Sequence, residues 1–524
     1  MSGRQAKAQR VAAIVDTEQE VIAPQRRASR LTRVPIVNRF LPPEAFVSDV
    51  EEVSEHAAAA GELAPWDVPG SQLRPDGWQS ASRARRGWYA PAHQGAATTT
   101  RQAEIVATAH FGAPTGFDGI VNGRDTLTRT AFAHDPITAY RRTPRGLTSP
   151  NVIVLGQTGS GKSSWTTCNL IMKPLMLRKR RAVVCSKKDR GGECEHAETT
   201  RQLGNEPFRF LANGAQGEGR VINLMDPAIV RVVDGIQGQK LMLDTAIQLQ
   251  RHRSSGTVAS VEEAGWEDQA LRLALRSLLA DHEDTRTPTL ADLSARLGAV
   301  DPDRGDYSLR SRERLHQAGL SISHVLNDLL ETYGGVFDGE TSSEVDLTHK
   351  LTTFDISQLP SDGAVIPIVM AAANMWMLGR IKDEAGWATN VIYEEGWHMI
   401  GGPSVGLIQS NEKLSRSLGM SNIFIMHKGS DIPPESAGVT VIQEAQTAYI
   451  FRQEHEQDAA WAQRTFNLDQ DTTKVLMGLG TGHCIAKIAD MPETEVEHLR
   501  SEWEKELTDS DQAMMGDSAD ALGH

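Results

Sequence analysis

The chain has 524 residues, which is too long for one ordinary domain core, so about two or three structural units are expected. Charged residues make up 23% of the chain and hydrophobic residues 40%, as in a soluble globular protein. The net charge of -14 argues against a protein whose whole surface grips nucleic acid, because neutralising phosphates needs clustered Lys and Arg. Any contact with DNA is therefore expected to be local and weak.

The cysteines and the apolar runs bear on the compartment. Four cysteines without paired spacing match no zinc pattern and are too few to staple so long a chain, so we expect a reducing, cytoplasmic location. The N-terminus has no apolar signal core. The longest apolar run, residues 365–378, contains Pro367 and Asn374 and falls short of the ~20 residues that a bilayer needs. It predicts a buried helix.

Residues 1–104 are rich in Ala, Arg, Pro, Gly and Gln and show no sustained periodicity, which predicts a mostly flexible region. Its basic residues, among them Arg26, Arg27 and Arg30, could contact an anionic membrane or DNA, or could form a solvated basic arm. Both interpretations stay open. Order is expected to begin near Ile105.

Residues 105–240 are interpreted as the first part of an α/β core. The apolar run 151–155 is followed by a glycine loop and then an amphipathic stretch, which predicts strand, loop and helix. A second strand is predicted at residues 181–185, as a parallel βαβ unit requires. Residues 241–335 change to helical spacing, with punctuation at residues 287–289, and predict an all-helical insertion.

Residues 336–490 return to strand patterns and are interpreted as the second part of the core. Strands are predicted at residues 351–356, 390–393 and 422–426, with helices between them. The acidic segment 491–524 predicts one helix and then a loose tail.

A phosphate-binding loop is the strongest motif in the chain, because it lies between a predicted strand and a predicted helix. Its residues, together with the serine that follows, are Gly156, Gln157, Thr158, Gly159, Ser160, Gly161, Lys162, Ser163 and Ser164. The glycines would let backbone N–H groups face the phosphates of ATP at the positive end of the next helix. Lys162 would add a charge at the β and γ phosphates, and the Ser163 hydroxyl would coordinate Mg2+. The alternative is a Gly-rich turn.

Two acidic residues, Glu394 and Glu395, directly follow the apolar run of a predicted strand. In a nucleotide-hydrolysing site Glu394 would hold the Mg2+ shell, and Glu395 would orient or deprotonate water. A pair of glutamates at the end of a strand is also common as a solvated turn. The phosphate-binding loop elsewhere in the chain favours the catalytic interpretation.

From about Asp135 to Asp490 the chain resembles the conjugative type IV secretion ATPases of the VirB-four and TraC type, within the HerA/FtsK superfamily of P-loop NTPases. The resemblance rests on the order of several short segments. These are Asp135-Pro136, Tyr140, residues 148–151, 221–226, 287–290 and 354–356, Glu394-Glu395-Gly396-Trp397, and residues 416–419. The resemblance implies a RecA-like core interrupted by a helical subdomain, a homo-hexameric ring, ATP and Mg2+ as ligands, and membrane subunits of a conjugation apparatus as partners.

Two positions near the expected site depart from the family or leave a role open. After the strand at 422–426 the family usually has Thr-Gln, whose Gln senses the γ phosphate, whereas this chain has His427 and Lys428. His427 can still donate a hydrogen bond. Arg416 lies where the family has a basic residue near the subunit boundary and is a candidate arginine finger, with Arg452 as its rival.

The segment after the second strand also departs from the family. Where the family has Asp-x-Lys-Gly-Glu, this chain has Cys-Ser-Lys-Lys-Asp at residues 185–189. A metal held by Cys185, Cys194 and His196 is disfavoured, because their spacing fits no standard zinc pattern.

The functional prediction is an ATP-hydrolysing motor that energises conjugative or type IV secretion. It would be cytoplasmic, with a peripheral position at the inner face of the cell membrane left open. Two alternatives stand beside it: a DNA-translocating coupling protein or HerA/FtsK-like DNA pump, and a nucleotide-gated assembly scaffold that does not cycle.

Overall fold

The structure is a computed structural model that describes residues 119–508 with internal gaps. The gaps fall at residues 143–145, 214–217, 231–235, 255–259, 282–285, 300–306, 383, 385, 401, 430, 431 and 433–435. Before residue 119 it describes two short strands, β1 (Arg27–Ala28) and β2 (Phe46–Val47), which pair antiparallel. The predicted flexible N-terminal region with its basic arm, and the predicted tail after residue 508, otherwise lie outside the described residues.

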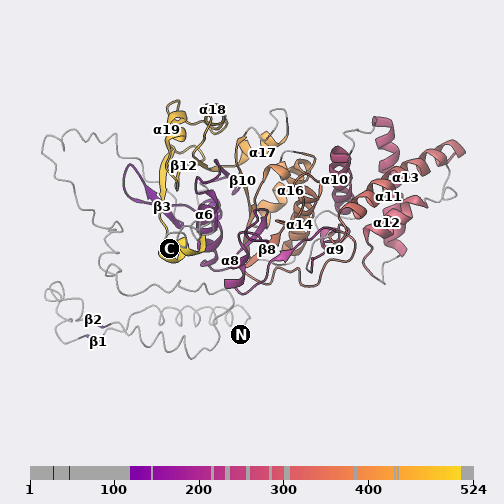
Figure 1. The fold of residues 1–524 in the computed structure, drawn as a ribbon, viewed down its shortest axis with the longest axis horizontal. Helices are drawn as coiled ribbons and strands as arrows, with labels where there is room; N and C mark the ends of the chain where they lie inside the picture. Colours follow the sequence, from indigo (N-terminus) through magenta and orange to yellow (C-terminus); the bar gives the residue numbers. More distant parts are fainter. Residues whose placement is uncertain are drawn as a thin grey trace, which may run out of the picture. The chain divides into compact units, whose positions relative to one another are not determined.

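A mixed sheet of eleven strands runs through the described part of the chain (Figure 1). The strand order is β4-β3-β13-β12-β11-β5-β10-β9-β6-β8-β7. The strands from β11 to β7 in this order are parallel, and the strands from β12 to β4 extend the sheet antiparallel. The bounds are β3 (Val121–Asp125), β4 (Ala131–Ala133), β5 (Val152–Leu155), β6 (Arg180–Ser186), β7 (Phe208–Arg209), β8 (Leu351–Asp355), β9 (Ala388–Tyr393), β10 (Met420–Met426), β11 (Thr447–Phe451), β12 (His483–Ile488) and β13 (Thr494–His498).

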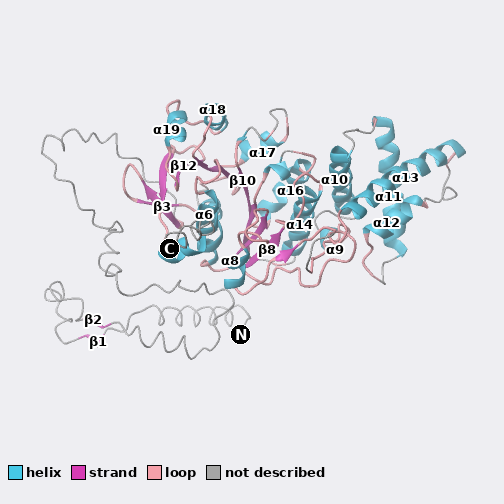
Figure 2. Ribbon diagram, viewed as in Figure 1, coloured by secondary structure: helices cyan, strands magenta, loops and turns pink. Residues whose placement is uncertain are grey.

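Helices connect the strands and flank the sheet, as Figure 2 shows. Their bounds are α5 (Pro136–Arg141), α6 (Lys162–Trp165), the π-helical η5 (Thr166–Met172), α7 (Lys173–Leu175), α8 (Ala197–Gln202), α9 (Pro227–Val230), α10 (Gln237–Ser254), α11 (Val261–Asp281), α12 (Leu290–Gly298), α13 (Leu309–Thr332), α14 (Val365–Lys382), α15 (Trp397–Ile400), α16 (Val405–Ser417), α17 (Gly438–Glu444), α18 (Glu456–Thr465), α19 (Thr472–Gly478) and α20 (Glu502–Thr508). The predicted α/β core is therefore confirmed.

The strands predicted from the sequence all form. Residues 151–155, 181–185, 351–356, 390–393 and 422–426 correspond to β5, β6, β8, β9 and β10. All five strands are buried along their whole length. Apolar runs of this kind are typical of parallel strands covered on both faces, which is why the sequence predicts these strands.

Strand β5 shows how the two faces of the sheet are covered. Ile153 and Leu155 pack into one apolar cluster with residues of α14, and Val152 and Val154 pack into another with Trp165 of α6. Successive side chains of a strand point to opposite faces, so this alternation separates the two cores. The helix that follows the glycine loop is thereby fixed against one face of the sheet.

The predicted helical insertion is formed by α10 to α13, which lie between β7 and β8 in the chain. The apolar spacing that predicted helix is buried at Leu271, Leu275 and Leu278 of α11. The predicted punctuation begins α12: the Thr289 backbone N–H donates to Asp292 Oδ2 at 2.8 Å, and the two side chains form a capping box. In the right part of Figure 1, α11, α12 and α13 pack together.

Helix α14 contains the longest apolar run and is a core helix, as predicted. Among the described residues it is the one helix long and apolar enough to span a membrane, and 89% of its apolar window is buried inside the protein. Its polar residue Asn374 donates from Nδ2 to the Tyr393 hydroxyl at 2.6 Å. A neighbouring strand therefore satisfies the amide nitrogen of Asn374, whereas its Oδ1 is buried without a hydrogen-bond partner among the described residues.

The acidic segment 491–524 was predicted to form one helix and then a tail; its described residues form a strand, β13, which was not predicted, and then the helix α20. Residues 494–498 form β13, which pairs antiparallel with β12 and β3, and the helix α20 begins at Glu502. Val496 is fully buried, and Glu497 accepts from Arg124 Nε at 3.0 Å. The strand was not predicted because the cationic partner of Glu497, Arg124 on β3, lies far away in the sequence.

Candidate functional site

A glycine loop joins β5 to α6, as the motif predicts. Gly161 has φ +102, a left-handed backbone that residues with a Cβ avoid, and it directly precedes Lys162 at the start of α6. At Gly156 a Cβ would lie 2.5 Å from the Cβ of Phe451 on β11. The Gly156 N–H donates to the carbonyl oxygen of Met426 at 3.3 Å. The loop is therefore held against the ends of both neighbouring strands, and glycine is required where it meets them.

The ammonium group of Lys162 is folded back over this loop. Its Nζ donates to the carbonyl oxygens of Gly156 and, at 2.7 Å, Gln157, and it lies 3.4 Å from His427 Nδ1. Burial lowers the pKa of Lys162 to about 8, although the Glu395 carboxylate acts in the opposite direction. A partly desolvated cation at a helix N-terminus is suited to an anionic ligand, which would stabilise its charge.

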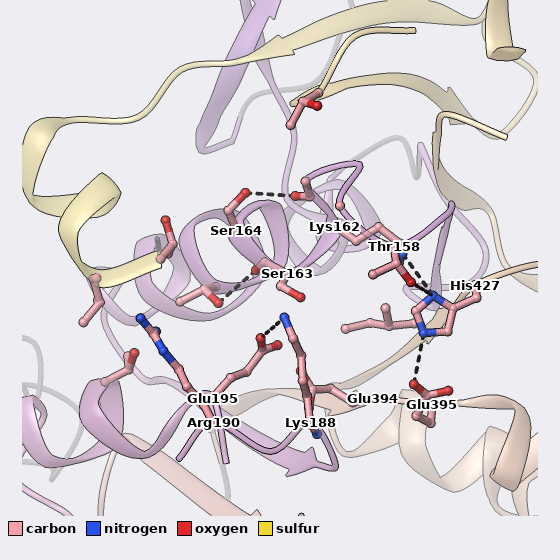
Figure 3. Close-up of a pocket in the computed structure, with 18 of the residues that line it drawn as sticks. Thr158, Lys162, Ser163, Ser164, Lys188, Arg190, Glu195, Glu394, Glu395 and His427 are labelled. Carbon is pink, nitrogen blue, oxygen red and sulfur yellow. Dashed lines mark hydrogen bonds and ion pairs between the residues drawn. The ribbon is translucent and has the colours of Figure 1, made fainter. Parts of the chain in front are cut away.

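The loop opens onto a cavity of about 230 Å³ (Figure 3). The predicted site residues that line it are Thr158, Gly159, Gly161, Lys162, Ser163, Ser164, Glu394, Glu395 and His427. Gly156, Gln157 and Ser160 form the turn behind these residues, where Ser160 Oγ donates to the Gln157 carbonyl at 2.7 Å. The structure therefore brings both predicted halves of the site, the loop and the strand-end acids, to one cavity.

The strand order explains why these segments meet. Strand β10 lies between β5, which carries the loop, and β9, which ends before Glu394 and Glu395. His427 directly follows β10. Because the carboxyl ends of parallel strands meet at one edge of a sheet, His427 is placed between the loop and the acids. Thr158 Oγ1 lies 3.5 Å from His427 Nδ1 on the loop side.

Glu395 is held in a defined orientation by two donors. Its Oε2 accepts from Trp397 Nε1 at 2.9 Å, and its Oε1 lies 3.1 Å from His427 Nε2. Burial alone would raise the pKa of Glu395, but the hydrogen bonds from His427 and Trp397 outweigh it and leave the pKa below its ordinary value. Glu395 also has φ +52, which is uncommon for a residue with a side chain and clusters at functional sites.

Glu394 is buried, and both of its carboxylate oxygens have polar contacts. Its Oε2 accepts from Ser186 Oγ at 2.6 Å and from the Lys187 backbone N–H at 2.9 Å, and its Oε1 lies 3.1 Å from His196 Nε2. Burial opposes ionisation, but the charge of His196 and the hydrogen bonds from His196 and Ser186 together hold the pKa of Glu394 below its usual range. Glu394 therefore carries a fixed negative charge at the cavity wall.

The segment after β6 contributes residues that the sequence interpretation missed. Lys188, Arg190 and Glu195 line the cavity opposite the loop, as Figure 3 shows. Lys188 Nζ pairs with Glu195 Oε2 at 2.8 Å. Burial, and then the neighbouring charge of Glu394, raise the pKa of Glu195 to about 7. The position of this segment could have indicated its role, because it follows β6, a strand that ends at the same edge of the sheet as β9.

The C-terminal segment also reaches the cavity, which no sequence pattern indicated. Arg500, Leu507 and Thr508 are lining residues, and Arg500 Nη1 donates to Thr508 Oγ1 at 3.0 Å. Arg500 follows β13, so this strand, which was not predicted, brings these residues to the site.

The two candidate arginine fingers lie outside the cavity lining of their own chain. Arg416 is half-buried near the end of α16, and its Nη1 donates to the Thr148 carbonyl at 3.4 Å. Arg452 follows β11, and its carbonyl oxygen accepts from the Gln157 N–H of the loop at 3.1 Å. A role for either guanidinium at the site of a neighbouring protomer stays a prediction.

Comparison with known proteins gives similarity at the level of fold. No protein-family model and no curated protein sequence matches the chain. Among solved structures, VirB4 of Thermoanaerobacter pseudethanolicus matches with a TM-score of 0.59 and 19% identity, over 75% of this chain and 99% of that one. The plasmid coupling protein TrwB, in complex with ADP and Mg2+, matches with a TM-score of 0.46 and 12% identity, over 72% of this chain and 89% of that one.

Identity this low establishes fold and leaves activity to the site itself. The match to VirB4 covers nearly all of that chain, and the sheet, the glycine loop and the helical insertion are features of this protein's own structure. The described part of the chain therefore has the RecA-like P-loop NTPase fold of VirB4, which is the fold that the sequence resemblance predicts.

Proposed function

We propose that this protein binds Mg-ATP in the cavity between the glycine loop and the end of β9, and hydrolyses it as the motor of a conjugative type IV secretion apparatus. The observation that carries the proposal is the single cavity lined by Lys162, Ser163, Glu394 and Glu395. It joins a phosphate cradle to strand-end carboxylates, the two parts that nucleotide hydrolysis requires. The fold of VirB4 supports the choice of motor.

The residues around the cavity fit magnesium and a triphosphate. Hydroxyl and carboxylate oxygens, as in Ser163 and Glu394, are the ligands that Mg2+ prefers, and both residues line the cavity. Mg2+ would neutralise charge that develops on the phosphates. Lys162, whose Nζ now contacts loop carbonyls, would turn to the β and γ phosphates. The Gly161 to Ser163 backbone would present N–H groups to the same phosphates.

Glu395 is the residue proposed to act on water. Its carboxylate is ionised at neutral pH and is oriented by Trp397 and His427, so it can accept a hydrogen bond or a proton from a water at the γ phosphate. His427 touches both Lys162 and Glu395. We infer that it senses the γ phosphate, because movement of Lys162 toward a nucleotide would change the contacts of the imidazole.

The first test compares two substitutions. Lys162→Ala should abolish nucleotide binding or turnover, because it removes the main positive charge of the cradle. Glu395→Gln should still bind ATP but hydrolyse it about 10²–10⁴-fold more slowly. Binding is measured with a fluorescent ATP analogue and turnover by phosphate release. Full activity of Lys162→Ala would end the proposal, and normal turnover of Glu395→Gln with a crippled Glu394→Gln would reverse the roles of the two acids.

We propose that the working form is a homo-hexameric ring in which an arginine of one protomer completes the site of the next. Specific activity should then rise with protein concentration. Mixing an Arg416→Ala chain with a Lys162→Ala chain should restore activity at mixed interfaces, and success with Arg452→Ala alone would move the role to that residue. A monomer that sediments alone and turns over at a constant specific rate contradicts the ring.

The proposed ring lies in the cytoplasm, at the inner face of the membrane, bound to membrane subunits of the secretion apparatus. A DNA pump must neutralise several phosphates at once, so its ATPase rate should depend steeply on DNA and salt. We expect little stimulation by single-stranded or duplex DNA, in keeping with the net charge of -14. Strong stimulation that survives removal of residues 1–104 would favour the DNA-translocating alternative.

A further inference from the structure

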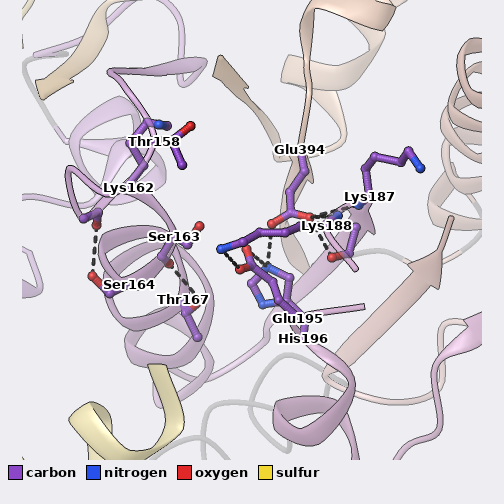
Figure 4. Close-up of polar contacts among 12 residues, drawn as sticks. Thr158, Lys162, Ser163, Ser164, Thr167, Lys187, Lys188, Glu195, His196 and Glu394 are labelled. Carbon is purple, nitrogen blue, oxygen red and sulfur yellow. Dashed lines mark hydrogen bonds and ion pairs between the residues drawn. The ribbon is translucent and has the colours of Figure 1, made fainter. Parts of the chain in front are cut away.

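Three side chains, Glu195, His196 and Glu394, form a cluster at the cavity (Figure 4). Glu195 and Glu394 line the cavity, and the buried His196 contacts both acids. Glu195 and His196 come from the segment between β6 and α8, and Glu394 follows β9. One ligand atom from each residue lies within 4.8 Å of the others. His196 Nε2 is 3.1 Å from Glu394 Oε1 and 3.7 Å from Glu195 Oε1. We call these residues the Glu-His-Glu cluster.

Each carboxylate of the cluster is anchored through one oxygen and presents the other to the imidazole. Glu195 Oε2 pairs with Lys188 Nζ at 2.8 Å. Glu394 Oε2 accepts from Ser186 Oγ and from the Lys187 backbone N–H. In metal centres, outer hydrogen bonds of this kind fix the orientation of the ligands and raise their affinity. The cluster has such outer partners in place.

One oxygen of the cluster has no donor. Among the described residues, Glu195 Oε1 is a buried atom without a hydrogen-bond partner, and the Glu195 side chain is only 9% exposed. A buried acceptor left unsatisfied costs about 1–3 kcal/mol. A second carboxylate, Glu394, lies beside it with its own charge. A cation between the two acids would satisfy the oxygen and relieve their repulsion.

From this geometry we propose that the Glu-His-Glu cluster binds one divalent transition-metal ion through Glu195 Oε1, His196 Nε2 and Glu394 Oε1. Mixed imidazole and carboxylate ligands suit Zn2+ or Mn2+, whereas Mg2+ takes oxygen ligands. Three protein ligands leave further positions for water or for an oxygen of a bound anion. The proposal goes beyond nucleotide hydrolysis, because the ion binds without a nucleotide.

The test measures metal on the full chain in the absence of nucleotide. Protein freed of metal with a chelator is dialysed against Zn2+ or Mn2+, and bound metal is counted by mass spectrometry. Co2+ serves as a spectroscopic probe, since its visible absorption reports nitrogen and oxygen ligands. We expect about one ion per chain. His196→Gln should weaken binding at least about tenfold, because a ligand is lost.

A matched control is available elsewhere on the sheet. His483 on β12 also faces a glutamate, Glu495, with Nδ1 and Oε1 3.2 Å apart, but among the described residues this pair is not part of a group of three possible ligands. His483→Gln should leave metal binding unchanged. Because His196 is buried and its substitution could impair folding, Glu195→Gln is the second variant, and it should also weaken binding at least about tenfold. Circular dichroism checks that each variant is folded.

The cluster shares Glu394 with the proposed Mg2+ site, so the controls that distinguish the two ions are variants of the glycine loop. Lys162→Ala and Ser163→Ala should keep the metal, because neither side chain belongs to the cluster. The proposal is overturned if the chain retains no Zn2+ or Mn2+, or if folded Glu195→Gln and His196→Gln bind as tightly as the parent. Loss of the ion in Ser163→Ala but not in Glu195→Gln would assign it to the glycine loop and would likewise overturn the proposal.

Discussion

Replacing His427 by alanine tests whether this residue couples the glycine loop to the proposed catalytic carboxylate. The imidazole lies between Lys162 Nζ, 3.4 Å from Nδ1, and Glu395 Oε1, 3.1 Å from Nε2. Glu395 has φ +52, a conformation that costs about 1–3 kcal/mol and needs support from its surroundings. Without His427, the carboxylate keeps one of its two side-chain donors, Trp397 Nε1.

The size of the effect follows from the contact. A hydrogen bond to a charged group contributes about 1.5–3 kcal/mol. The side chains of His427 and Glu395 are 42% and 31% exposed, so water screens the contact and the lower value applies. Since about 1.4 kcal/mol is a factor of ten in rate, His427→Ala should lower kcat about tenfold if this energy orients the carboxylate. The kcat of Glu395→Gln should be lowered further, by about 10²–10⁴-fold.

The assay is steady-state ATP hydrolysis, with kcat and KM measured separately. Trp397→Phe removes the other donor and should show a similar loss in kcat. His427→Gln can still donate a hydrogen bond and should recover part of the rate, which a purely structural role would not predict. The reasoning is refuted if His427→Ala keeps its kcat within about twofold while Glu395→Gln is slow.

Three further substitutions test the fold around the site. Asp135→Ala should lower the free energy of unfolding by about 3–5 kcal/mol in urea titrations, because the Arg180 guanidinium, 4% exposed, loses the carboxylate oxygens at 2.6 and 3.0 Å; a loss below about 1 kcal/mol contradicts this. Gly379→Ala should cost about 1–3 kcal/mol, seen as a lower melting temperature, because the new Cβ would lie 1.7 Å from the Ala228 oxygen. Burial lowers the pKa of His134 from 6.5 to about 4, so only the unfolded chain binds that proton as pH falls through this range. Stability should therefore drop by up to about 3 kcal/mol between these pH values, and an equally steep profile for His134→Gln would count against this reasoning.

Much of the fold could be predicted from the sequence, because the patterns that indicate its strands and helices involve residues close together in the chain. The strands β5, β6, β8, β9 and β10 are fully buried apolar runs, and such a run predicts a strand without knowledge of its neighbours. The start of α12 could be predicted for the same reason, since its capping box uses residues three apart. The C-terminal strand β13 was not predicted, because its pairing with β3 and the partner of Glu497 are set by contacts across the chain.

Some residues of the candidate site could likewise be predicted from local sequence, whereas their meeting in one cavity depends on contacts across the chain. The spacing from Gly156 to Ser163 determined the phosphate-binding loop, because the required backbone turn and its charges lie within eight consecutive residues. The pair at 394 and 395 was found from its place at the end of a strand. The order β5-β10-β9-β6 brought these segments together.

What only the tertiary structure decided is the far wall of the cavity and the state of its charges. Glu394 and His196 are 198 residues apart in the chain and 3.1 Å apart in space. Glu195 and His196 carry no motif of their own, and their chemistry arises because β6 and β9 are neighbours that end at the same edge. Local spacing can specify a loop that binds phosphate, whereas burial and proximity across strands determine which side chains meet there and what their acids and imidazoles can bind.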